Sequence, residues 1–112
     1  MSEYLFLYRA PSGDSASPEQ MQQIMQKWLA WFKDLGEKGR IKNMGQPLET
    51  GGKVVSGTAK SVHDGPFAET KDVVNGYTLV ETKDLAEAAE LAKGCPILDR
   101  GGSVEVRPIR KM

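Results

Sequence analysis

The residues best suited to chemistry lie in one short run of this 112-residue chain, His63-Asp64-Gly65-Pro66-Phe67. His63 is the only histidine. Histidine is the side chain whose ordinary pKa lies near neutrality, so we expect any proton transfer to use it. Asp64 adds a carboxylate, and Gly65-Pro66 predicts a turn, because glycine permits positive φ and proline fixes φ near a turn value. His63 and Asp64 are therefore the candidate catalytic residues.

Two interpretations of each side chain stay open. Neighbours in an extended segment point to opposite sides, so His63 and Asp64 can cooperate only if the turn bends the chain sharply. Asp64 is otherwise expected to hydrogen-bond the backbone of the turn. His63 is either a turn or interface histidine, or a general base that takes a proton from a small organic substrate. In the second case Asp64, Glu69 or Glu81 would orient it.

Aromatic side chains are the candidate ligand contacts. The candidate ligand-binding residues are Phe67, Trp31, Tyr8 and Tyr77. Phe67 follows the predicted turn, and Trp31 is expected toward the edge of a helical stripe, so these two are favoured. The competing interpretation is core packing, which we expect for Phe6, Trp28 and Tyr77.

The composition of the chain argues against several classes of function. Fifteen basic and fifteen acidic residues cancel and form no basic run, which disfavours nucleic-acid binding. No dinucleotide-binding fingerprint or metal-ligand spacing is present, so no cofactor and no metal are expected. Cys95, the only cysteine, is expected as a buried apolar side chain in a reducing compartment. The N-terminus has neither a signal-peptide pattern nor a membrane span, which predicts a cytoplasmic protein.

The surrounding elements follow from capping and periodicity. The sequence predicts a β-α-β-(β)-β-α-β order within one domain, residues 1–112. Ser17 and Gln20 form a capping-box pattern before a broad apolar helical stripe, and Gly39 can end that helix in a left-handed conformation. Residues 50–53, which contain Gly51-Gly52, predict a hairpin turn. The predicted strands span residues 4–8, 41–48, 53–56, 75–81 and 103–109, and the second helix spans residues 84–93.

This order predicts an α+β fold of the ferredoxin-like split-βαβ type with an antiparallel sheet. Two helices can cover one face of such a sheet, yet Tyr4-Leu5-Phe6-Leu7-Tyr8 is apolar on both sides. An exposed apolar face usually marks a partner surface or a ligand pocket. We therefore expect a face-to-face homodimer, with a pocket between sheet and helices or at the dimer seam.

Several segments together resemble the DGPF-type, YCII-related domain. They are residues 63–71, Asn75-Gly76-Tyr77, Gly94-Cys95-Pro96 and residues 102–109. They occur in the expected order along nearly the whole chain. The resemblance implies a ferredoxin-like fold that pairs into a dimeric α+β barrel, in agreement with the argument from the open sheet face.

The resemblance implies two classes of function. Some YCII-like relatives are enzymes that use a histidine with an aspartate, in one case to dehalogenate a ring compound, which points to His63 and Asp64. Other members resemble partners of extracytoplasmic-function sigma factors, which implies regulation. The first hypothesis is a dimeric module that binds a small molecule or a regulatory protein at the sheet or dimer cleft. The alternative is a cofactor-free lyase, dehalogenase or isomerase that uses His63. An exposed His63 far from any concavity favours the module.

Overall fold

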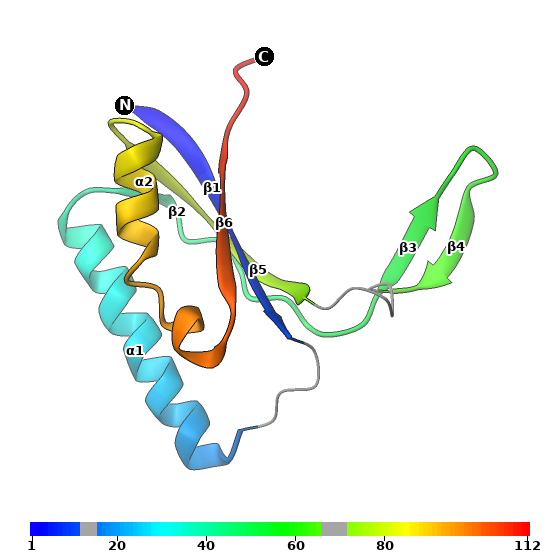
Figure 1. Ribbon diagram of the computed structural model, residues 1–112, viewed down its shortest axis with the longest axis horizontal. Helices are drawn as coiled ribbons and strands as arrows, with labels where there is room; N and C mark the ends of the chain where they lie inside the picture. Colours follow the sequence, from blue (N-terminus) through cyan, green and yellow to red (C-terminus); the bar gives the residue numbers. More distant parts are fainter. Residues whose placement is uncertain (12–15, 66–71) are drawn as a thin grey trace.

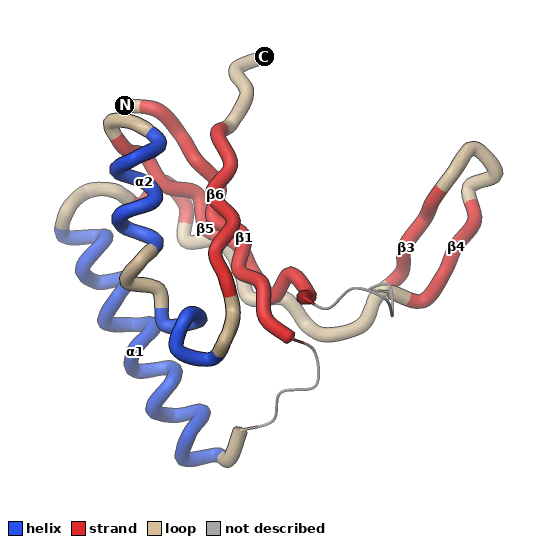
Figure 2. Tube along the Cα trace, in the orientation of Figure 1, coloured by secondary structure: helices blue, strands red, loops and turns tan. Residues whose placement is uncertain are grey.

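The chain forms one antiparallel sheet with two helices on one side and a separate hairpin on the other (Figures 1 and 2). A computed structural model describes residues 1–11, 16–65 and 72–112. The predicted α+β class is confirmed. The elements are β1 (Ser2–Pro11), α1 (Pro18–Glu37), β2 (Ile41–Asn43), β3 (Lys53–Ser56), β4 (Ser61–Asp64), β5 (Asp72–Thr82), α2 (Leu85–Ala92), the short 3-10 helix η1 (Pro96–Arg100) and β6 (Ser103–Pro108).

The main sheet has the strand order β2-β5-β1-β6, and every neighbouring pair is antiparallel. β1 is central and pairs with β5 along its whole length, from Ser2 opposite Thr82 to Pro11 opposite Asp72. Because β1 and β2 flank β5, the two βαβ units interleave as the ferredoxin-like pattern requires. β2 lies at the edge, as predicted, although it spans only three residues.

Short-range sequence signals correctly predict where α1 begins and ends. The Ser17 hydroxyl accepts a hydrogen bond from the Gln20 backbone N–H, and the Gln20 side chain accepts one from the Ser17 N–H. This reciprocal pair satisfies two backbone donors that a helix start leaves unbonded. The helix ends at Glu37, and Gly39 has a φ of 69°. The predicted start and end of this helix are both confirmed.

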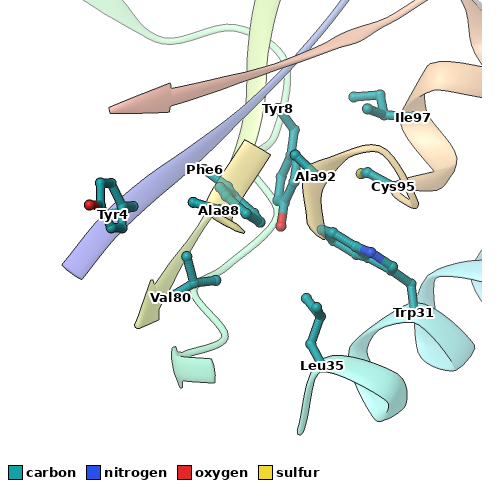
Figure 3. Close-up of a cluster of buried hydrophobic side chains, with 10 residues drawn as sticks. All are labelled: Tyr4, Phe6, Tyr8, Trp31, Leu35, Val80, Ala88, Ala92, Cys95 and Ile97. Atoms are coloured by element: carbon teal, nitrogen blue, oxygen red, sulfur yellow. The ribbon is translucent and has the colours of Figure 1, made fainter. Parts of the chain in front are cut away.

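The core lies between the sheet and the helices (Figure 3). Tyr4, Phe6 and Tyr8 point toward the helices and are buried, whereas Leu5 and Leu7 between them are only partly covered. Alternation along a strand produces these two faces. We call the uncovered side of the sheet the open face. The buried apolar residues are Tyr4, Phe6, Tyr8, Trp31, Leu35, Val80, Ala88, Ala92, Cys95 and Ile97.

The apolar stripe of α1 is only partly used by this core. Trp31 and Leu35 are its buried residues, so the expectation that Trp31 lies toward the edge of the stripe is wrong. Met21, Met25 and Leu29 remain more than half exposed. For Met21 and Met25, Figure 1 shows the physical reason, because the N-terminal part of α1 extends beyond the strands that it would have to cover.

The hairpin differs most from the sequence prediction. β3 does not return along β2 after a turn at residues 50–53. It pairs with β4 in a second sheet of two strands, from Lys53 opposite Asp64 to Ser56 opposite Ser61. The reversal lies at residues 57–60, where Gly57 and Lys60 have positive φ angles of 75° and 56°. We call residues 53–64 the arm.

The arm includes the first residues of the run for which a turn at Gly65-Pro66 is predicted, and the turn itself is only partly within the described residues. His63 and Asp64 belong to strand β4, Gly65 follows as a bend, and residues 66 and 67 lie outside the described residues. The arm projects on the side of the sheet away from the helices (Figure 1). The radius of gyration is 15.5 Å, against about 13 Å for a compact domain of this length. The arm therefore extends from the body and does not fold back onto it.

Among the described residues, no helix has both the length and the hydropathy needed to span a membrane.

Candidate functional site

The predicted site residues fall in separate parts of the structure. His63 and Asp64 lie on the arm, Tyr8 and Trp31 lie in the core, and Tyr77 lies on the open face. Phe67 lies outside the described residues. Within one copy of the chain, the described residues of this set do not converge on one site.

Strand geometry separates His63 from Asp64. His63 lies opposite Val54 and Asp64 lies opposite Lys53 in the β3–β4 register, so alternation directs the two side chains to opposite faces of the arm. The Asp64 carboxylate accepts a hydrogen bond from Lys53 Nζ, and its side chain is 89% exposed. His63 is exposed as well. The sharp bend that would bring this histidine and carboxylate together is absent from β4.

Tyr8 is a buried hydrogen-bond donor. Its hydroxyl donates to Thr78 Oγ1 at 2.6 Å, and Thr78 Oγ1 donates to the Met44 carbonyl at 2.9 Å. Burial raises the pKa of Tyr8 well above its usual value of 10, an effect that the Thr78 hydrogen bond only partly offsets. Tyr8 therefore stays neutral at physiological pH, with its hydroxyl hydrogen-bonded. Its ring packs edge-on against Trp28, with a centroid distance of 4.8 Å.

Trp31 is held in the core from two directions. Its Nε1–H donates to the Leu91 carbonyl at 3.2 Å, and its ring stacks on Phe6 with a centroid distance of 6.1 Å (Figure 3). Only 7% of Trp31 is exposed. Trp31 thus has a packing role in the core, and Trp28, which is expected in the core, is partly buried and packs against it.

Tyr77 belongs to an apolar group at the centre of the open face. Tyr77 lies opposite Leu7, and Leu79 lies opposite Leu5, in the β1–β5 register. Directly opposed residues on one face pack against each other. Tyr77 is 37% exposed, so the expectation that it lies in the core is wrong. These four side chains make a continuous apolar surface that neither helix covers.

Paired charges border this surface along β6. Arg9 Nε and an Arg107 guanidinium nitrogen each lie 3.0 Å from a different oxygen of Glu105. The hydrogen bonds from Arg107 and then Arg9 hold the pKa of Glu105 below its usual value, so Glu105 is ionised at neutral pH. Two guanidinium groups thus share one carboxylate, which leaves this border with an excess of positive charge.

A second set of charges lies toward β2. Lys42 Nζ lies 3.3 Å from Glu81 and 3.9 Å from Glu3. Glu3 and Glu81 are direct cross-strand neighbours, and the lysine offsets their mutual repulsion. The open face thus has an apolar centre with charged borders, which is the arrangement typical of protein interfaces.

Two hollows in the described part of the chain lie away from the predicted site residues. One is formed by the first residues of β1 and the segment that follows β6, and the other lies between α1 and η1. None of the predicted site residues lines either hollow. Residues 1–11, 16–65 and 72–112 contain no cluster of three or more metal-ligating His, Cys, Asp or Glu side chains.

Cys95 is buried as predicted, with 2% exposure at the start of η1. Burial raises the pKa of its thiol to about 12. Because the thiolate is the reactive species, we expect an aromatic disulfide reagent at pH 8 to modify the folded protein at least 100-fold more slowly than the protein in guanidinium. Equal rates in the two states would show that Cys95 is accessible.

Comparison with known proteins identifies the family. The profile of the YCII-related domain matches residues 3–112. The chain belongs to the YCII-related family. This YCII-related protein is 30% identical over 97 residues to the uncharacterized protein R00369 of Rhizobium meliloti (strain 1021), and the match covers 83% of this chain and 78% of that protein.

One solved structure is similar to this YCII-related protein at 17% sequence identity. It is 5-chloro-2-hydroxyhydroquinone dehydrochlorinase (TftG) from Burkholderia phenoliruptrix AC1100 in complex with 2,5-dihydroxybenzoquinone. The match covers 98% of this chain and 95% of that one, with a TM-score of 0.46.

Two features of this YCII-related protein were missed from sequence. The arm had a readable signal, because residues 53–56 and 61–64 are short apolar-containing runs on either side of Gly57. The ion pairs of Glu105 with Arg9 and Arg107 could be predicted only in part from the sequence. Alternation places Glu105 and Arg107 on one face of β6, but the contribution of Arg9 depends on the register of β1 with β6.

Proposed function

We propose that this YCII-related protein is a homodimeric module that binds a small organic molecule in a cleft at the open face, where two copies meet. The observation that carries this proposal is the uncovered apolar group of Leu5, Leu7, Tyr77 and Leu79 with its charged borders. An apolar face of this kind favours association with a partner surface. Its location on the central strands favours a second copy of the same sheet as the partner.

The position of His63 favours a binding module over an enzyme. A general base needs to reach the proton that it removes from a bound substrate. His63 is exposed on the arm, while Asp64 points the other way and pairs with Lys53. Catalysis through His63 remains the alternative, and it requires a second copy or a ligand to enclose the histidine.

The charges of the open face indicate the class of ligand. An aromatic ring suits the surface made by Tyr77 and the leucines, since aromatic rings attract one another in stacked and edge-to-face arrangements. The positive excess at Arg9 and Arg107 favours an anionic group, because guanidinium groups bind carboxylates in a bidentate geometry. We therefore propose a small aromatic carboxylate or a similarly charged ring compound.

A thermal-shift titration with benzoate and salicylate tests this proposal. A ligand that binds only the folded state raises the melting temperature, and the rise grows with the logarithm of the ligand concentration once this exceeds the dissociation constant. We expect millimolar salicylate to raise the melting temperature of the wild type and of His63→Ala, and to have no effect on Tyr77→Ser. Phenol, which lacks the carboxylate, serves as the control for charge. A shift that disappears in His63→Ala and persists in Tyr77→Ser would contradict a site on the open face.

A further inference from the structure

We propose that the arm, residues 53–64, packs against a second copy of this chain through its Val55–Val62 face. The inference rests on the proposed homodimer and adds a second contact surface to it. Each copy would thus be held both by the open face and by the arm of its partner. Four observations support this placement: the isolation of the arm, its exposed valines, its position and the size of the open face.

Within the described residues, the arm is not part of the main sheet and neither helix covers it. β3 and β4 form a sheet of two strands that is separate from the main sheet, and each strand has four residues. A two-stranded hairpin alone is marginally stable in water, because it has no third strand or helix to cover it. A surface outside the described chain is therefore expected to cover one side of the arm.

One face of the arm is apolar where it is most exposed. Val55 and Val62 are directly opposed in the β3–β4 register, and their exposed fractions are 64% and 62%. The other face carries Val54, which is partly buried, opposite His63. The exposed valine pair, and not the histidine, is thus the surface expected to lie against a partner. The Lys53–Asp64 ion pair lies on the same face at the base of the arm.

The position of the arm favours a second copy as the partner. In Figure 1 the helices lie on one side of the sheet, and the arm projects on the side of the open face. Two packed sheets lie about 10 Å apart. A copy seated on the open face would therefore come to lie beside the arm. The two-fold symmetry of a dimer would place the partner's arm in the same relation to the first copy.

The size of the open face gives an independent reason to expect a second contact surface between the two copies. The sheet pairs over ten residues in β1–β5, six in β1–β6 and two in β2–β5. With strands about 4.8 Å apart and about 3.3 Å per residue, this makes a footprint of roughly 400 Å². A stable interface of ordinary size buries about 800 Å² on each partner. The sheet contact alone falls short of this value. An arm that contacts the second copy adds the missing area on both subunits.

Sedimentation equilibrium tests the inference with matched variants of the arm. We expect the double variant Val55→Ser/Val62→Ser to raise the dimer dissociation constant at least tenfold. Ser61→Ala, which changes an exposed residue on the opposite face of the same arm, should leave the constant within twofold of the wild type. Unchanged dissociation of the double variant would overturn the role of the arm and leave the proposed dimer intact. A monomeric wild type would instead refute the dimer itself.

Hydrogen exchange on the unmodified protein supplies a measurement that needs no variant. We expect amides of β3 and β4 to gain protection as the protein concentration rises through the dissociation constant, together with amides in β1 and β5. Protection in β1 and β5 without any change in the arm would contradict the inference. That result would assign the valine pair to a different partner.

Discussion

Phe6→Ala is expected to lower the free energy of unfolding by about 3–5 kcal/mol, the usual cost of removing a fully buried aromatic side chain. Phe6 is fully buried on the central strand and stacks on Trp31 with a centroid distance of 6.1 Å. The substitution removes apolar contacts from both the sheet and α1. The surrounding strands can refill little of the resulting cavity, because β1 is paired on both sides.

Urea denaturation followed by tryptophan fluorescence measures this effect. Leu29→Ala is the control, because Leu29 is 57% exposed on α1, and exposed substitutions usually change stability by no more than about 0.5 kcal/mol. A loss below about 1 kcal/mol for Phe6→Ala would contradict the placement of the core between β1 and α1.

Leu7→Glu is expected to dissociate the homodimer while the subunit stays folded. Leu7 is next to Phe6 in sequence but lies on the open face, opposite Tyr77 on β5 and Glu105 on β6. A carboxylate here would be buried in an apolar interface, and the nearby guanidinium groups of Arg9 and Arg107 are already engaged by Glu105. Burial of an unpaired charge costs several kcal/mol, so we expect the dissociation constant to rise at least 100-fold, equivalent to about 2.7 kcal/mol.

Light scattering after size-exclusion chromatography reports the mass of this variant, and circular dichroism reports its fold. Leu29→Glu introduces the same charge on the outer side of α1 and should leave the dimer unchanged. An intact Leu7→Glu dimer would show that the subunits associate through a different surface.

The sequence predicts the sheet and its two faces well because the relevant signals are local. Alternation in Tyr4-Leu5-Phe6-Leu7-Tyr8 separates the core face from the open face, and the structure buries Tyr4, Phe6 and Tyr8 accordingly. The capping box at Ser17 likewise depends on residues three positions apart. These features need no knowledge of distant parts of the chain.

The arm was missed because strand pairing depends on competing partners. Gly51-Gly52 has the composition of a hairpin turn, and both glycines do adopt positive φ. They do not join paired strands, because β2 is short and pairs with β5. β3 pairs instead with β4, and residues 57–60 form the turn between them. The choice between two glycine-containing turns is decided by pairing, which the local sequence does not encode.

The candidate site was predicted least well because it depends on three-dimensional coverage. Helical periodicity identifies the apolar side of α1, but it does not show that the sheet covers Trp31 and leaves Met21 and Met25 exposed. For the same reason Tyr77 was expected in the core. Its exposure follows from the placement of both helices on the other side of the sheet.

The mass of the wild-type protein in solution tests the central claim most directly. Sedimentation equilibrium at micromolar concentration should give twice the chain mass of 12.3 kDa, because the apolar centre of the open face requires a covering surface. A mass of one chain at the same concentration would contradict the proposed homodimer and the cleft that depends on it.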